Sequence, residues 1–145
     1  MSRRFDKTAT AGGERALEAL QAHVEACGLD AALVELVDLR VSQMNGCAYC
    51  LAMHGALARE HGVDSLRLDT VAAWRESSAF SARERAALAW AEAVTEVAKG
   101  VPDEAFDAAR AQFGERELAD LTWAVVVINA WNRAMVAFRV PIGET

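Results

Sequence analysis

Apolar residues recur at spacings of three and four along almost the whole chain, and this periodicity constrains the fold more than any other feature of the sequence. No long segment alternates polar and apolar residues with the period of two that a half-buried strand shows. Alanine, the best helix former and a residue of little bulk, occurs 31 times among the 145 residues. The sequence therefore predicts an all-α fold in which the helices approach one another closely.

Glycines and prolines divide the periodic pattern into segments, without a linker or an internal repeat. We expect one domain, a bundle of about six helices over residues 14–140, after a loose polar leader over residues 1–13. Ser81 and Glu84 form a capping box that marks the start of one helix. The segments with helical periodicity are 14–27, 31–43, 47–61, 65–76, 81–99, 102–113 and 115–139.

The net charge of −6, from 15 basic and 21 acidic side chains, argues against a nucleic-acid surface and against an anionic membrane as partner. The first residues are polar and lead into no apolar run, which predicts that there is no signal peptide. The longest apolar stretch, Trp123–Trp131, has nine residues and contains Asn129. A membrane span needs roughly 20 residues. We expect a cytoplasmic protein without nucleic-acid or membrane partners.

The last helical segment is apolar nearly all round between Leu121 and Trp131. In water such a helix must be covered on every side. Two explanations remain open: the helix is the centre of the bundle, or part of it is buried against another subunit. The second explanation predicts a symmetric homo-oligomer.

Two cysteines and a histidine share one helical face in the segment 47–54, which reads CAYCLAMH. At about 100° per residue, Cys47, Cys50 and His54 fall within an arc of about 60°. His54 follows Cys50 by one turn, and both cysteines lie in the first turn, where the helix dipole favours a thiolate. The segment thus supplies an activated sulfur, a second sulfur that can close a disulfide with it, and a base.

Redox or peroxide chemistry is the interpretation that this arrangement favours. A zinc site is an alternative, because thiolates and imidazole are zinc ligands. Its fourth ligand would have to come from Cys27, His23 or His61, none of which is paired at ligand spacing. A third alternative is structural, with two small buried cysteines and a core histidine. We expect no metal and no organic cofactor.

Glu35 is the candidate proton acceptor for this site. It lies within the apolar run 33–37 of the helix before the cysteines, and we expect it to be the only carboxylate of that helix within an apolar stripe. The asparagine–glycine turn that follows lets this helix fold back beside the next, so that Glu35 reaches His54 or the second cysteine as a proton relay. The alternative is a solvated glutamate that pairs with Arg40 or Lys7.

Glu35 is separated by eleven residues from the C-x-x-C pair, and a histidine follows that pair after three further residues. This order resembles the carboxymuconolactone decarboxylase family and, within it, the alkylhydroperoxidase D-like branch. The resemblance covers about residues 14–140. Further segments similar to small single-domain members are Gly28–Asp30, Arg40–Gly46, Ala73–Arg75 with Phe80, Glu84–Leu88 and Ile128–Arg133.

The resemblance implies an all-helical protein that assembles into trimers or hexamers and acts as a peroxidase or disulfide reductase. By the family pattern, Cys50 reacts with a hydroperoxide and Cys47 resolves the product to a disulfide. Glu35 and His54 relay protons, and an external dithiol or thioredoxin-like protein reduces the disulfide. Tyr49 stands where the best-known alkylhydroperoxidase D has a histidine, and a phenol with a pKa of about 10 gives Cys47 no base at neutral pH.

A rival function from another class is a non-catalytic oligomeric protein whose cysteine pair senses redox state or switches binding. Lactone decarboxylation is less expected, because that branch of the family lacks the cysteine pair.

Overall fold

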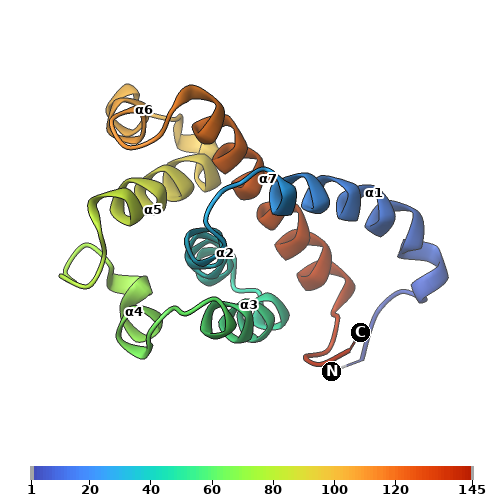
Figure 1. Ribbon diagram of the computed structural model, residues 1–145. Coiled ribbons are helices and arrows are strands. Elements are labelled where there is room, and N and C mark those ends of the chain that lie inside the picture. Colours follow the sequence, from blue (N-terminus) through green and yellow to red (C-terminus); the bar gives the residue numbers. More distant parts are fainter. Residues whose placement is uncertain (1, 145) are drawn as a thin grey trace.

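Seven α-helices and two short 3-10 helices lie within residues 2–144, the part of the chain that this computed structural model describes, and no strand occurs in that part (Figure 1). The predicted all-α class is therefore confirmed. The helices are α1 Lys7–Ala26, α2 Ala31–Asn45, α3 Ala48–Glu60, α4 Ser65–Thr70, α5 Ala82–Thr95, α6 Asp103–Arg110 and α7 Glu115–Phe138, with 3-10 turns at Val71–Ala73 and Val97–Lys99.

Helix α2 is the centre of the bundle. It packs against α3, α5 and α7, and Figure 1 shows it nearly end-on between them. Leu36, Val37 and Val41 on this helix are fully buried, and each such side chain contributes roughly 1.5–3 kcal/mol when it leaves water. Because α2 is covered on several sides, its polar residues Glu35, Asp38 and Ser42 are also removed from solvent.

Helix α7 is the longest helix, and this chain covers only part of its surface. Leu121, Val125 and Ile128 are buried in the core, whereas Trp123 and Val126 are 48% and 39% exposed. A central helix covered on all sides, one of the two explanations for its apolar stretch, is therefore not found within this chain. By length and composition, α7 is the one helix of the described residues that could cross a membrane, but it packs against α1, α2 and α5 as a core helix does.

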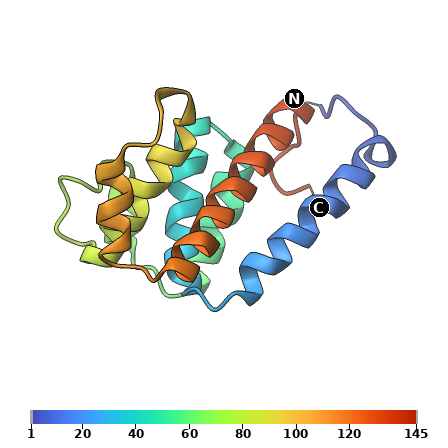
Figure 2. The ribbon, with the colours of Figure 1, turned by 90° about the horizontal axis from the view of Figure 1, so that it is seen from above.

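The first helix begins at Lys7 rather than at residue 14, so about half of the expected leader over residues 1–13 is helical. Asp6 explains the early start, because its carboxylate accepts a hydrogen bond from the backbone N–H of Thr8 at 2.8 Å and caps the helix. Figure 2 shows α1 beside α7 and apart from the remaining helices. One side of α1 is thereby left without a helix packed closely against it.

The other helix boundaries lie close to the predicted ones. The capping box is present: Ser81 Oγ accepts from the backbone N–H of Glu84, and the Glu84 carboxylate accepts from the backbone N–H of Ser81. The segments expected at 65–76 and 81–99 end sooner as α-helices and continue as 3-10 turns.

Candidate active site

The turn between α2 and α3 brings the predicted site residues together. Helix α2 is followed by its C-cap Gly46, whose φ of 66° lies in the left-handed region that glycine adopts without strain. The Nδ2 group of Asn45 attaches the turn to α7, because it donates to the Oδ1 atoms of Asn129 and Asn132 at 3.0 and 2.9 Å. Helix α3 consequently packs along α2, and side chains of the two helices meet between them.

Cys47 and Cys50 are joined by a disulfide at the start of α3, as the sequence predicts. Cys47 is the N-cap residue, and its Sγ accepts a hydrogen bond from the backbone N–H of Cys50. Both residues are 1% exposed. The third cysteine, Cys27, is a free thiol at the end of α1. The structure therefore represents the oxidised form of the C-x-x-C pair.

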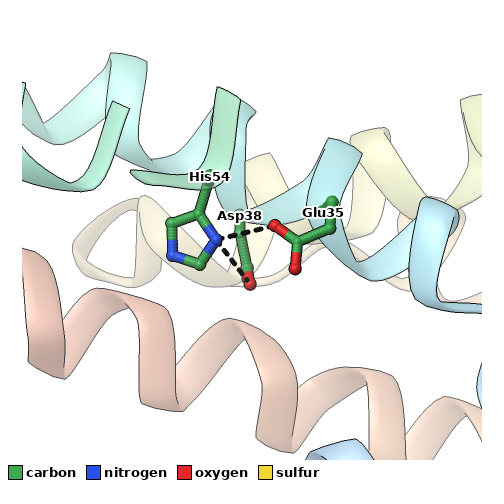
Figure 3. A group of neighbouring side chains, drawn as sticks. All are labelled: Glu35, Asp38 and His54. Atoms are coloured by element: carbon green, nitrogen blue, oxygen red, sulfur yellow. Dashed lines mark hydrogen bonds and ion pairs between the residues drawn. The ribbon is translucent and has the colours of Figure 1, made fainter. Parts of the chain in front are cut away.

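His54 and Glu35 form a buried hydrogen-bonded pair between α3 and α2 (Figure 3). The Nδ1 atom of His54 lies 2.8 Å from Oε2 of Glu35. A proton on Nδ1 that is donated to this carboxylate leaves Nε2 for a reactant. The predicted contact of Glu35 is thus present, while the alternative partners Arg40 and Lys7 bind glutamates on α5 and near the C-terminus.

The expectation that Glu35 is the only carboxylate of its helix in an apolar stripe is wrong. Asp38, nearly one turn further along α2, is 3% exposed. Its Oδ2 atom lies 3.6 Å from Nδ1 of His54, and its Oδ1 atom has no hydrogen-bond partner among the described residues (Figure 3). The sequence signal was the i, i+3 spacing of the two carboxylates, which puts them on one helical face.

Burial and charge shift the pKa values in this cluster. Removal from water raises the pKa of Asp38 to about 7; the charge of His54 opposes this shift and that of Glu35 adds to it. Burial by itself lowers the pKa of His54. The hydrogen bond to Glu35 and the negative charges of both carboxylates outweigh burial, so the pKa of His54 lies above its ordinary value. The site therefore favours the imidazolium form of His54 more than water does.

The same three side chains are the potential metal ligands of the site. One ligand atom of each lies within 4.8 Å of the others, and an imidazole with two carboxylates is a donor set that a divalent cation can use. The alternative zinc site predicted above used Cys47, Cys50 and His54 instead. In this structure the two cysteines form a disulfide, so neither provides a thiolate ligand. His23, named above as a possible fourth ligand, pairs instead with Asp120 at 3.1 Å.

Two cavities flank the disulfide. A cavity of about 570 Å³ is bordered by Cys50 together with Glu35 and His54. A second cavity, of about 390 Å³, is bordered by Cys47, and Arg139 is the one charged side chain among the described residues that line it. Of the two disulfide-bonded cysteines, Cys50 therefore shares its cavity with Glu35 and His54, and Cys47 does not.

The fold and the site define a class of small all-α proteins in which a C-x-x-C pair at a helix start adjoins a buried Glu–His pair. The model of the carboxymuconolactone decarboxylase family matches residues 13–93. The chain belongs to this family, and the predicted likeness to its alkylhydroperoxidase D-like members is confirmed by the structural neighbours.

Three relatives illustrate that likeness. The uncharacterized protein YdfG of Bacillus subtilis is 41% identical over 104 residues, which make up 71% of each chain. A protein of unknown function from Agrobacterium tumefaciens, suggested to be the antioxidant defence protein AhpD, superimposes with a TM-score of 0.94 at 36% identity over 99% of this chain and 100% of its own. The debrominase Bmp8 has a TM-score of 0.80 at 22% identity over 89% of this chain and 70% of its own, a likeness of fold alone.

Proposed function

We propose that this protein is a thiol-dependent hydroperoxide reductase. The observation that carries the proposal is that Cys50 and the hydrogen-bonded pair of Glu35 and His54 border the same cavity. A peroxide in that cavity would meet a sulfur nucleophile and a proton donor together. Among the relatives, the Agrobacterium protein supports antioxidant chemistry by its description.

In the reduced protein, the Cys50 thiolate attacks the terminal oxygen of a hydroperoxide, R–O–OH. The O–O bond breaks, Cys50 becomes a sulfenic acid, and the alkoxide RO⁻ takes a proton from Nε2 of His54 to leave as an alcohol. A protonated His54 serves this step twice, since its charge favours the thiolate before attack and its proton neutralises the leaving group afterwards. Glu35 holds the imidazole in place through Nδ1.

The Cys47 sulfur then attacks the sulfenic sulfur of Cys50, the S–O bond breaks, and the hydroxyl takes the proton of the Cys47 thiol and leaves as water. The product is the disulfide present in this structure. An external dithiol restores both thiols and is itself oxidised to a disulfide. No metal or organic cofactor enters these steps. This cycle assigns Cys50 as the peroxidatic residue and Cys47 as the resolving residue.

A homo-oligomer, trimeric or hexameric, belongs to the same proposal. The exposed Trp123 and Val126 on α7 form an apolar surface that a second copy of the chain would cover. Light scattering at micromolar concentration tests this, and a monomer of 15.6 kDa would contradict it. A cytoplasmic location, where reducing dithiols are abundant, is proposed with it.

The test of the function is a screen of hydroperoxides and dithiol reductants with the wild-type protein beside Cys47→Ser and Cys50→Ser. Steady consumption of peroxide that requires both cysteines supports the reductase. A change of assembly upon oxidation without turnover supports the rival redox sensor instead.

A further inference from the structure

The larger cavity combines apolar walls with an acidic side. Met53 and Leu57 of α3 and Trp131 and Met135 of α7 line it near Cys50. These side chains offer contact area to an organic group and no charge. An apolar group of a substrate would therefore be buried next to Cys50.

Another part of the cavity lining belongs to α1. Glu14, Glu18, Gln21 and Glu25 line it, and their spacings of four, three and four place them on one face of that helix. This is the face that α1 turns toward the site. Helix α1 thus presents a row of acidic side chains to the cavity that holds Cys50.

Positive charge does not balance this row. The one arginine among the described residues that line the cavity, Arg3, already binds Glu14 at 3.1 Å and Glu144 at 3.2 Å, and Lys7 also binds Glu144, at 3.5 Å. Five glutamates line the cavity against this one guanidinium and two histidines. A cleft lined by one sign of charge repels ligands of that sign and concentrates the others.

We propose that the substrate of this cavity is an apolar hydroperoxide that carries no negative charge, and that the acidic face of α1 excludes carboxylate-bearing hydroperoxides. This inference rests on the proposed reductase function. It adds a substrate class, since the reductase chemistry at Cys50 is indifferent to a distant carboxylate.

The test compares a medium-chain hydroperoxy acid with its own methyl ester, which has the same reacting group and nearly the same shape. We expect kcat/KM for the ester to exceed that for the acid by about tenfold or more at low salt. The preference should shrink as ionic strength rises, because salt screens the glutamates. Equal rates, or a faster acid, would overturn the inference.

Matched variants locate the effect. Glu18 is exposed on α1 and lines the cavity, whereas Glu76 is exposed and does not. Glu18→Lys should reduce the preference for the ester several-fold, and Glu76→Lys, the same change of charge elsewhere, should leave it unchanged. An equal effect of both substitutions would contradict a role of the α1 face.

A binding experiment with unreactive ligands tests the charge selection independently of the proposed reductase activity. The unreactive pair, the parent fatty acid and its methyl ester, is titrated while the fluorescence of Trp131 is followed in a variant that keeps this tryptophan alone. If no hydroperoxide is consumed at all, the reductase proposal fails. Tighter binding of the ester would still support the charge selection, and equal or tighter binding of the acid would overturn it.

Discussion

The two cavities beside the disulfide differ in what they offer a reactant. On the Cys50 side stand Glu35 and His54, so a proton can be delivered where a bond to oxygen breaks. On the Cys47 side the described lining holds neither a carboxylate nor an imidazole. Cys47 and Cys50, three residues apart, thus border cavities with different linings. This difference supports our proposal that peroxide oxidises Cys50 and that Cys47 closes the disulfide.

The largest expected effect distinguishes the two cysteines. Cys50→Ser should lower the rate of peroxide consumption by at least about 10³-fold, because it removes the nucleophile. Cys47→Ser should keep one rapid turnover per subunit and then stop at the sulfenic acid. Rapid mixing with one to several equivalents of peroxide measures both. A burst in Cys50→Ser and none in Cys47→Ser would reverse the assignment.

The next effect concerns His54. His54→Gln should slow the attack on peroxide by about 100-fold near neutral pH, since it removes both the charge that favours the thiolate and the proton donor. The deficit in the alkylation rate of Cys50 should shrink at alkaline pH, where the thiolate forms unaided. His61→Gln is the control, because His61 lines the same cavity without belonging to the Glu35 pair. Equal pH profiles for the two variants would leave His54 a structural residue.

Glu35→Gln should have a smaller effect, about tenfold, because the amide still holds the imidazole through a hydrogen bond. The loss of the negative charge should lower the pKa of His54, as Glu35 is one of the groups that raise it. The alkaline limb of the pH–rate profile should therefore shift to lower pH. Titration of the His54 ring by NMR measures the pKa directly, and an unchanged value would exclude the coupling.

Much of this site follows from local spacing in the sequence. The C-x-x-C disulfide and the placement of His54 one turn later are consequences of helix geometry, and the glycine turn between α2 and α3 accounts for the contact with Glu35. Local spacing in the sequence does not predict the two cavities. They arise where α1, α2, α3 and α7 meet, and spacing within one helix does not determine how four helices enclose a space.

Asp38 shows where single-residue reasoning stops. It directly follows the apolar run 33–37 that contains Glu35, and an aspartate at the edge of an apolar stripe is usually solvated. Whether the Asp38 side chain is buried depends on whether α3 packs over that edge of α2. The start of α1 was missed for a related reason: two glycines predict a break, but the Asp6 cap and the packing on α7 sustain the helix.

Substitution of Asp38 is expected to have the smallest effect on the reaction. Its main effect is expected on the free energy of unfolding. In the folded protein the pKa of Asp38 is raised to about 7, above its value of 3.8 without burial. Between these values the folded state binds a proton that the unfolded state has released, so the free energy of unfolding falls as pH rises through this window. His54, whose pKa is also raised, contributes stability at low pH that is lost as pH rises through its folded pKa. Both groups act in the same direction.

Asp38→Asn should therefore stabilise the protein at neutral and alkaline pH and have little effect at about pH 4, where the wild-type carboxyl is protonated in the folded state. At about 1.4 kcal/mol per pKa unit, the gain should reach about 1–4 kcal/mol above pH 7, reduced by any hydrogen bond that the new amide fails to make. Urea unfolding of the oxidised protein across this pH range measures it, with the exposed Asp69→Asn as control. Parallel stability curves for Asp38→Asn and the wild type would mean that Asp38 ionises freely in the folded protein. If the gain is present while peroxide turnover changes only a few-fold, the proton relay passes through Glu35 and His54, and Asp38 acts on it through charge alone.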